Sequence, residues 1–321
     1  MRTRRSQSSG NPVSPFDEAH DKPHGHTPVL LHEVLDMLEI LPDDTVVDAT
    51  LGGAGHARAI AERLGKGGTF IGFDLDPDAV GRAKEALSEI APRIHLVQAN
   101  FRAMREELHK LGIEKVSKVL FDLGWSSYQL DSGRGFSLRN DEPLLMTYSN
   151  PPAGGGSMLT ARTIVNEWAE ESLADVIFGW GEERYARRIA KMIVARRQTK
   201  PFETAQELAE AIKGAVPAGY RKGRLHPATK TFQALRIAVN DELGALSQGL
   251  RGAWELLAPG GRIAVITFHS IEDRIVKHAF ADLEKKGEGK RLTKKPVVPS
   301  EEETRENPRA RSAKLRVIEK P

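Results

Sequence analysis

The sequence contains no cysteine among its 321 residues. That absence excludes disulfide bonds, thiolate metal ligands and a cysteine nucleophile, and it is typical of proteins from a reducing compartment. No apolar run approaches the roughly 20 residues of a membrane-spanning helix. The chain also has no large excess of positive or negative residues, since its net charge is only +3. We therefore expect a cytoplasmic globular protein without a membrane partner, in which any contact with nucleic acid depends on local basic patches.

The first 25 residues differ in composition from the rest of the chain. They open on the basic stretch Met1–Arg5 and continue with serine, glycine and proline. A transit peptide is disfavoured by the acidic residues Asp17 and Glu18, so we predict a disordered basic arm over residues 1–25. The remaining length is sufficient for one large domain or two of ordinary size.

A glycine-rich turn organises the chain. An apolar strand ends at Asp48, and glycines follow at positions 52, 53 and 55 before helical residues 57–64, so that backbone N–H groups and a helix N-terminus converge. A second apolar strand, residues 69–73, is followed by Asp74, about 20 residues beyond the glycines, where nucleotide-binding folds place a carboxylate on ribose hydroxyls. This order predicts a site for a nucleoside-containing cofactor; a tight turn without a ligand is the alternative.

Further apolar strands are predicted at residues 93–97, 118–121 and 262–268, with weaker candidates at 294–298 and 315–318. Strands that alternate with helices predict an α/β fold with right-handed crossovers and a mainly parallel, Rossmann-like sheet. Ligands of such sheets bind beyond the carboxyl ends of the strands. Asp48, Asp74, Phe101 and Asp122 all follow strand ends, so we expect them to meet at one site.

The alternation stops between residues 122 and 262. Residues 125–156 are rich in Gly, Ser, Pro and Asn and predict a long, substrate-facing loop. Apolar spacings of three and four then predict helices at 157–168, 173–178, 182–197 and 204–216, and a stripe from residue 232 to 257 predicts one long helix or two in line. Capping boxes are expected for Thr204 with Glu207 and for Ser270 with Asp273. We predict a discontinuous core (26–127 and 232–321) and a loop plus helical insertion domain (128–231) for RNA recognition.

Several nucleoside-containing cofactors suit the glycine turn and its acid. A P-loop is excluded, since no Gly-Lys-Ser/Thr follows the glycines, whereas a dehydrogenase stays open on these residues alone. Two features favour S-adenosylmethionine as a methyl donor. The helix–Pro-Gly-Gly–strand entry at residues 259–262 is common in methyltransferases that use it, and the fourth strand ends in Asp122, where these folds place groups that meet adenine or the accepting atom.

Basic clusters favour a nucleic acid as the methyl acceptor. They lie at residues 187–200, 221–230, 285–295 and 309–316, and on one face they would neutralise phosphates. Solvated helix faces paired with nearby glutamates are the competing interpretation. Methylation of cytosine at C5 normally needs a cysteine thiolate, so the missing cysteine excludes it. An exocyclic base amine, a ribose hydroxyl and a protein side chain remain as acceptors.

Seven segments resemble motifs of the RsmH (MraW) family, over a match that runs from about residue 26 to the C-terminus. They are His26–Leu31 (HTPVLL), Asp48–His56 (DATLGGAGH), Asp122–Asp131 (DLGWSSYQLD), Arg134–Ser137 (RGFS), His226–Ile237 (HPATKTFQALRI), Phe268–Arg274 (FHSIEDR) and Asn307–Arg316 (NPRARSAKLR). The resemblance implies a class I methyltransferase that uses S-adenosylmethionine to methylate N4 of a cytidine in the decoding region of 16S ribosomal RNA. It implies the small ribosomal subunit as partner, not DNA, and a monomer or homodimer.

The resemblance also implies the cofactor contacts, which are Ala54, Gly55, His56, Asp74, Phe101, Asp122 and Gln129. The base amine must lose a proton, and Asp122, Ser126, Ser127 and His269 follow strand ends where they can accept its hydrogens. For two of the predicted cofactor contacts a purely structural role is the alternative: core packing for Phe101 and a helix-start hydrogen bond for His56. Ser270 is expected to cap a helix, and Asp273 with Arg274 to form a structural pair. No motif predicts a metal.

Two segments depart from the family pattern. Ala54 stands where a third glycine is usual, and Leu145–Ser149 (LMTYS) replaces Asp-Met-Arg-Met-Asp in the predicted RNA-side loop. The lost acids and arginine favour a second hypothesis, a non-catalytic RNA-binding ribosome-assembly factor that retains the fold. A small-molecule or protein methyltransferase is the third.

Overall fold

The computed structural model describes residues 27–124, 127–130, 132–138, 140–149 and 158–321, without the side chains of Ser127 and Gln129. The predicted basic arm (1–25) and Ser126 therefore lie outside the described residues. None of the helices in the described ranges is long and apolar enough to cross a membrane.

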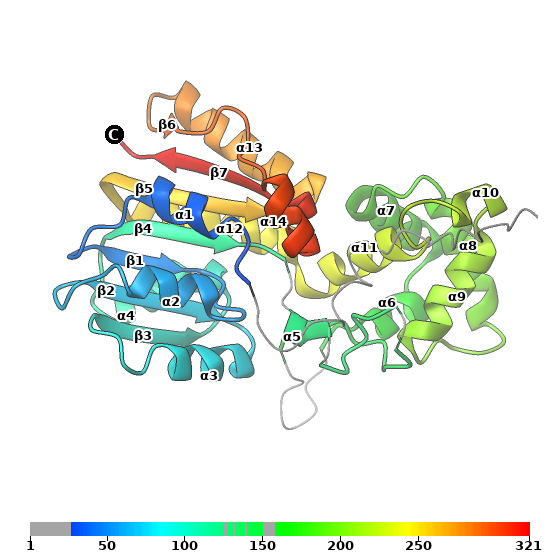
Figure 1. The fold of residues 1–321 in the computed structure, drawn as a ribbon. Helices are drawn as coiled ribbons and strands as arrows, with labels where there is room; N and C mark the ends of the chain where they lie inside the picture. The colour runs from blue at the N-terminus through cyan, green and yellow to red at the C-terminus, as the bar shows by residue number, and fades with distance from the viewer. Residues whose placement is uncertain (1–26, 125–126, 131, 139, 150–157) are drawn as a thin grey trace, which may run out of the picture.

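Seven strands form one sheet in the order β3-β2-β1-β4-β5-β7-β6 (Figure 1). The first five in this order are parallel, whereas β7 is antiparallel to both β5 and β6. This confirms the predicted α/β fold of Rossmann-like class I type. The strands are β1 (Thr45–Asp48), β2 (Thr69–Asp74), β3 (Arg93–Gln98), β4 (Val116–Asp122), β5 (Leu257–Thr267), β6 (Lys290–Arg291) and β7 (Lys314–Glu319).

Helices cover both faces of the sheet. Successive side chains of a strand point to opposite faces, so a continuous apolar strand needs a helical layer on each side. Val46 of β1 packs in a buried cluster with α1, α2 and α3, whereas its neighbour Val47 packs with α4, α12 and α13 on the other face. The helices of these layers are α1 (Leu31–Leu38), α2 (Gly55–Ala61), α3 (Pro77–Ala86), α4 (Met104–Lys110), α12 (Glu242–Leu256) and α13 (Ser270–Lys285); η2 (Phe101–Ala103), α14 (Glu301–Glu306) and η3 (Pro308–Ser312) are short.

The segment between β4 and α12 lies to one side of the sheet (Figure 1). Its own buried cluster contains only residues from Leu130 to Ala238, separate from the two clusters that flank the sheet. Its helices are α5 (Ser127–Leu130), α6 (Ala161–Glu167), α7 (Glu170–Gly181), α8 (Ala186–Arg197), α9 (Ala205–Ala215), α10 (Ala218–Arg221) and α11 (Thr229–Asn240). The division into domains at residues 128 and 231 stays a prediction.

Several local predictions change in the structure. Of the two arrangements predicted for the stripe from residue 232 to 257, the structure has two helices, because Asp241 between α11 and α12 has a left-handed backbone with φ of 47°. The predicted strand at 294–298 is reduced to one isolated bridge between Val297 and Leu315, and the two-residue strand β6 lies earlier in the chain. The expected capping box of Ser270 with Asp273 is wrong, since His269 and Glu272 form it.

Candidate active site

A cavity of about 600 Å³ opens at the carboxyl ends of β1, β2 and β4, within the size range of small-molecule sites. Residues at the strand ends line it together with residues of α11 and α12. Six of the predicted cofactor-binding and catalytic residues lie in its wall, namely Gly55, His56, Asp74, Phe101, Asp122 and His269. Ala54 and Asp48 stand behind the wall, and the side chains of Ser126, Ser127 and Gln129 are not among those described.

The glycine turn brings backbone to the cavity because two of its residues have left-handed φ angles. Gly52 has φ of 49° and Ala54 has φ of 63°, so alanine accepts here the conformation that glycine adopts without cost. A Cβ at Gly55 would lie 2.4 Å from Cγ of Pro28, so only glycine fits beneath the segment 27–30. The turn thus places the N-terminus of α2 at the cavity, where Gly55 and His56 line the wall.

Segment 27–30 closes one side of the cavity and is held by the C-terminal part of the chain. Thr27 and Val29 line the cavity. The backbone N–H of Leu30 donates to Oε1 of Glu303 at 2.7 Å, and Nδ2 of Asn307 donates to the Thr27 carbonyl at 3.2 Å. Residues 303–307 therefore complete the pocket although they are more than 270 positions away in the sequence.

Asp74 and Phe101, both predicted to contact the cofactor, line the cavity. Asp74 accepts backbone N–H groups of Gly52 and Asp76, both at 2.9 Å, so its carboxylate is fixed at the cavity edge. Burial raises the pKa of Asp74, although these two hydrogen bonds oppose the rise. The half-buried ring of Phe101 stands edge-on to Phe121, with centroids 5.4 Å apart, and it lines the cavity rather than only packing in the core.

Asp122 and His56 form a contact inside the cavity. Oδ2 of Asp122 lies 3.3 Å from Nδ1 of His56, whose Nε2 lies 3.0 Å from the carbonyl oxygen of Val29. The His56 side chain therefore does not serve the helix start, and that alternative is wrong. Asp48 is fully buried nearby; burial raises its pKa to about 7, partly offset by the charge of His56 and the hydrogen bond from Thr50.

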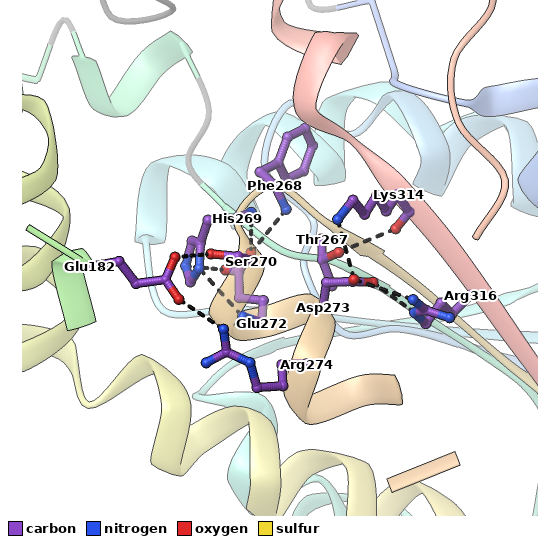
Figure 2. A network of polar contacts seen from close by, with 10 residues as sticks. All are labelled: Glu182, Thr267, Phe268, His269, Ser270, Glu272, Asp273, Arg274, Lys314 and Arg316. Atoms are coloured by element: carbon purple, nitrogen blue, oxygen red, sulfur yellow. Dashed lines mark hydrogen bonds and ion pairs between the residues drawn. The ribbon is translucent and has the colours of Figure 1, made fainter. Parts of the chain in front are cut away.

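His269 lines the cavity and also caps a helix. Its Nδ1 accepts the backbone N–H of Glu272 at 3.4 Å, and Oε2 of Glu272 accepts the backbone N–H groups of Phe268 and His269 (Figure 2). Ser270, expected to be the cap, instead donates its hydroxyl to Glu182 of the α7 C-terminus at 2.6 Å. Nδ1 of His269 is thus committed to the local backbone, and Nε2 lies 3.2 Å from Oε1 of Glu272, which competes with the predicted role in proton transfer.

Tyr148, Arg236 and Glu242 form a polar wall that sequence reasoning missed. Arg236 donates to both carboxylate oxygens of Glu242 at 2.8 Å, and the Tyr148 hydroxyl donates to Oε1 at 2.8 Å. All three line the cavity. Tyr148 belongs to the segment that departs from the family pattern, so the altered loop contributes directly to this wall. The apolar spacing of three and four continues across residues 240–242, so no local sequence signal pointed to this wall.

One group of three possible metal ligands occurs among the described residues: Glu242, His269 and Glu272. It is a poor metal site. Both oxygens of Glu242 are held by Arg236. Because Nδ1 of His269 accepts a hydrogen bond, a neutral ring carries its hydrogen on Nε2 and offers no lone pair there. We assign no metal to this group.

The basic clusters divide into structural and exposed members. Arg316 is buried and donates to Asp273 at 2.7 and 3.2 Å, and Lys314 reaches the same carboxylate (Figure 2). The expected pair of Asp273 with Arg274 is therefore wrong, since Arg274 contacts Glu182 at 2.8 Å. By contrast, Arg187, Arg188 and Lys191 form an exposed face of α8. Three further cations border the cavity: Arg224, Arg309 and Arg311.

Comparison with known proteins places the chain among methylases. A family model described as the MraW methylase family matches residues 23–321. Ribosomal RNA small subunit methyltransferase H of Clostridioides difficile is 46% identical and covers 92% of this chain and 98% of that protein. The protein of the same name from Deinococcus radiodurans is 48% identical and covers 98% and 96%. The chain therefore belongs to the MraW methylase family.

Proposed function

We propose that this protein transfers a methyl group from S-adenosylmethionine to N4 of a cytidine in the decoding region of 16S ribosomal RNA. The family and the names of the relatives support the coarser statement, a small-subunit rRNA methyltransferase dependent on S-adenosylmethionine. The observation that carries the proposal is the shared cavity wall of Gly55, Asp74, Phe101 and Asp122. It combines a backbone turn, a ribose acceptor, an aromatic platform and a carboxylate.

The residues of the wall suit the requirements of an exocyclic amine. The lone pair of such an amine is delocalised into the base, so the site must orient the nitrogen toward the methyl group and accept its hydrogens. Asp122 ends β4, and its Oδ1 is buried without a hydrogen-bond partner in the described part of the chain. We assign this oxygen to the amine. Arg224, Arg309 and Arg311 at the cavity border suit the phosphates on either side of the target nucleotide.

Labelled cofactor tests the proposal directly. We would incubate the protein with S-adenosylmethionine labelled in its methyl group and with small subunits that lack the modification, and then identify the labelled nucleoside by mass spectrometry. Label in N4-methylcytidine supports the proposal. Binding to the subunit without label would instead support the assembly factor, which the altered segment Leu145–Ser149 favours. Label in protein or in a small molecule would contradict both.

Substitution of Asp122 tests the assignment of its oxygen. Asp122→Asn keeps the shape of the side chain and removes the charge that receives a proton. We expect kcat to fall by about 10²- to 10⁴-fold, with a smaller change in the affinity for the cofactor. Asp36→Asn, on the exposed face of α1, is the matched control. Unchanged turnover in Asp122→Asn would rule out the assignment.

A further inference from the structure

The contacts of His56 determine how many protons the ring and its partner Asp122 share. The ring is almost fully buried and touches two oxygens, the carbonyl of Val29 at Nε2 and the carboxylate of Asp122 at Nδ1. A carbonyl oxygen only accepts hydrogen bonds, so Nε2 must carry a hydrogen. In a neutral ring Nδ1 is then bare, and its lone pair faces a carboxylate that, when ionised, is also only an acceptor. The contact is attractive only if one proton lies between Nδ1 and Oδ2.

Two arrangements satisfy this requirement. Either the ring is an imidazolium that donates to Asp122, or Asp122 is protonated and donates to a neutral ring. The surroundings favour the imidazolium. Burial alone would lower the pKa of His56, but the hydrogen bond and charge of Asp122, the charge of Asp48 and the bond to Val29 outweigh it, so the pKa lies above its ordinary value. The charged groups facing the ring come from β1 and β4 and are both acidic.

The second carboxylate oxygen of Asp122 completes the argument. Oδ2 is used by His56, whereas Oδ1 is buried and has no partner in the described part of the chain. An unpaired buried acceptor is costly, so it is expected where a ligand supplies the missing donor. Asp122 lines the cavity, and an amine hydrogen of a bound base would meet this need.

We propose that His56 is a charged positioning residue, which donates the hydrogen on Nδ1 to Oδ2 of Asp122 and leaves Oδ1 free to accept the proton that the methylated amine loses. This role rests on the proposed function. As the bond from N4 to the methyl carbon forms, the bond from sulfur to that carbon breaks, and the sulfonium becomes a neutral thioether. The amine nitrogen takes the positive charge and then transfers one proton to Oδ1. His56 keeps its own two ring protons throughout.

The charge of His56 can be measured without turnover. In protein labelled with ¹⁵N-histidine, the two ring nitrogens of an imidazolium have similar chemical shifts, whereas a neutral ring shows one bare nitrogen far downfield. At about pH 7.5, above the ordinary histidine pKa of about 6.5, we expect two protonated nitrogens for His56. His56→Gln assigns the signal. In Asp122→Asn the signal of His56 should titrate at lower pH. A neutral ring in the wild-type protein would overturn the proposal.

Kinetics with His56→Gln give the second readout. Glutamine can donate a hydrogen bond but cannot carry the charge, so we expect kcat to fall by about 10- to 100-fold while KM for the cofactor changes by less. In the wild type kcat should fall as pH rises through the raised pKa of His56, and this alkaline decline should vanish in His56→Gln. His109→Gln on α4 is the matched control. An identical pH profile in the variant would overturn the role of His56. If wild-type protein labels no rRNA, the proposed function fails, while the NMR result still decides the charge.

Discussion

Asp48→Asn should make the protein more stable at neutral and alkaline pH. Asp48 is completely buried behind the cavity. Its Oδ1 accepts the backbone N–H of Thr50 at 3.0 Å, and its Oδ2 has no hydrogen-bond partner in the described part of the chain. Asparagine keeps the acceptor for Thr50 and removes the charge. The protein therefore carries a buried carboxylate whose ionisation opposes folding.

The magnitude and sign follow from the pKa of Asp48. Burial raises this pKa from 3.8 to about 7 in the folded protein. A rise of about three pH units at 1.36 kcal/mol each makes ionisation cost about 4 kcal/mol of folding free energy. Above pH 7 the carboxyl is ionised in both folded and unfolded chains, so the whole cost is present. The cost decreases as pH falls from about 7 to about 4, because the folded protein then binds a proton that the unfolded chain does not.

Urea denaturation at several pH values measures this effect. We expect Asp48→Asn to unfold at higher urea than the wild type at about pH 8, and the difference in free energy to shrink by about 1.4 kcal/mol for each pH unit below 7. Hydrogen exchange of β1 and β4 amides reports the sheet separately from the helices between β4 and α12. Asp36→Asn on the exposed face of α1 should show no such pH dependence. A variant less stable than the wild type by the same amount at every pH would refute the reasoning.

Two further substitutions test how the structure supports the cavity. A Cβ at Gly249 of α12 would lie 2.6 Å from the Phe101 ring, so Gly249→Ala should displace that ring. We expect the affinity for the cofactor, measured by calorimetry, to fall about tenfold. Gly252→Ala is the control and should leave the affinity unchanged, because no atom lies within 4 Å of its new Cβ. Equal affinities would show that Phe101 does not contact the cofactor. Asp273→Ala leaves the buried side chain of Arg316 without its carboxylate partner and should lower the free energy of unfolding by about 3–5 kcal/mol. Arg274→Ala removes an exposed ion pair with Glu182 and should lower the free energy of unfolding by less than about 1 kcal/mol. Similar costs for the two would contradict the buried pairing.

The part of the fold that depends on local pattern could be predicted from the sequence. Continuous apolar runs marked the buried strands β1, β2 and β4, because strands covered on both faces cannot alternate with polar residues. The rule that ligands bind at the carboxyl ends of parallel strands then brought Asp74, Phe101 and Asp122 to one cavity. These predictions needed only short-range spacing and the handedness of crossovers.

Features that depend on distant residues were missed. Tyr148 and Glu242 are 94 positions apart, and Asp273 and Arg316 are 43 apart, so no local pattern pairs them. His269 was not expected to cap α13, because serine, threonine, aspartate and asparagine are the usual caps and Ser270 stood next to it. The break at Asp241 kept the apolar spacing of three and four on both sides, so the periodicity left one long helix and two in line as alternatives.

The position of β7 has a consequence for synthesis of the protein. This strand lies between β5 and β6, yet its residues 314–319 are translated after all of the other strands of the sheet. The anchors of segment 27–30, Glu303 and Asn307, are translated only shortly before it. A nascent chain that ends before these residues has an open edge at β5 and an unfastened wall beside His56. The cavity is therefore completed late in synthesis, and a partly translated polypeptide lacks part of the wall that the finished protein has.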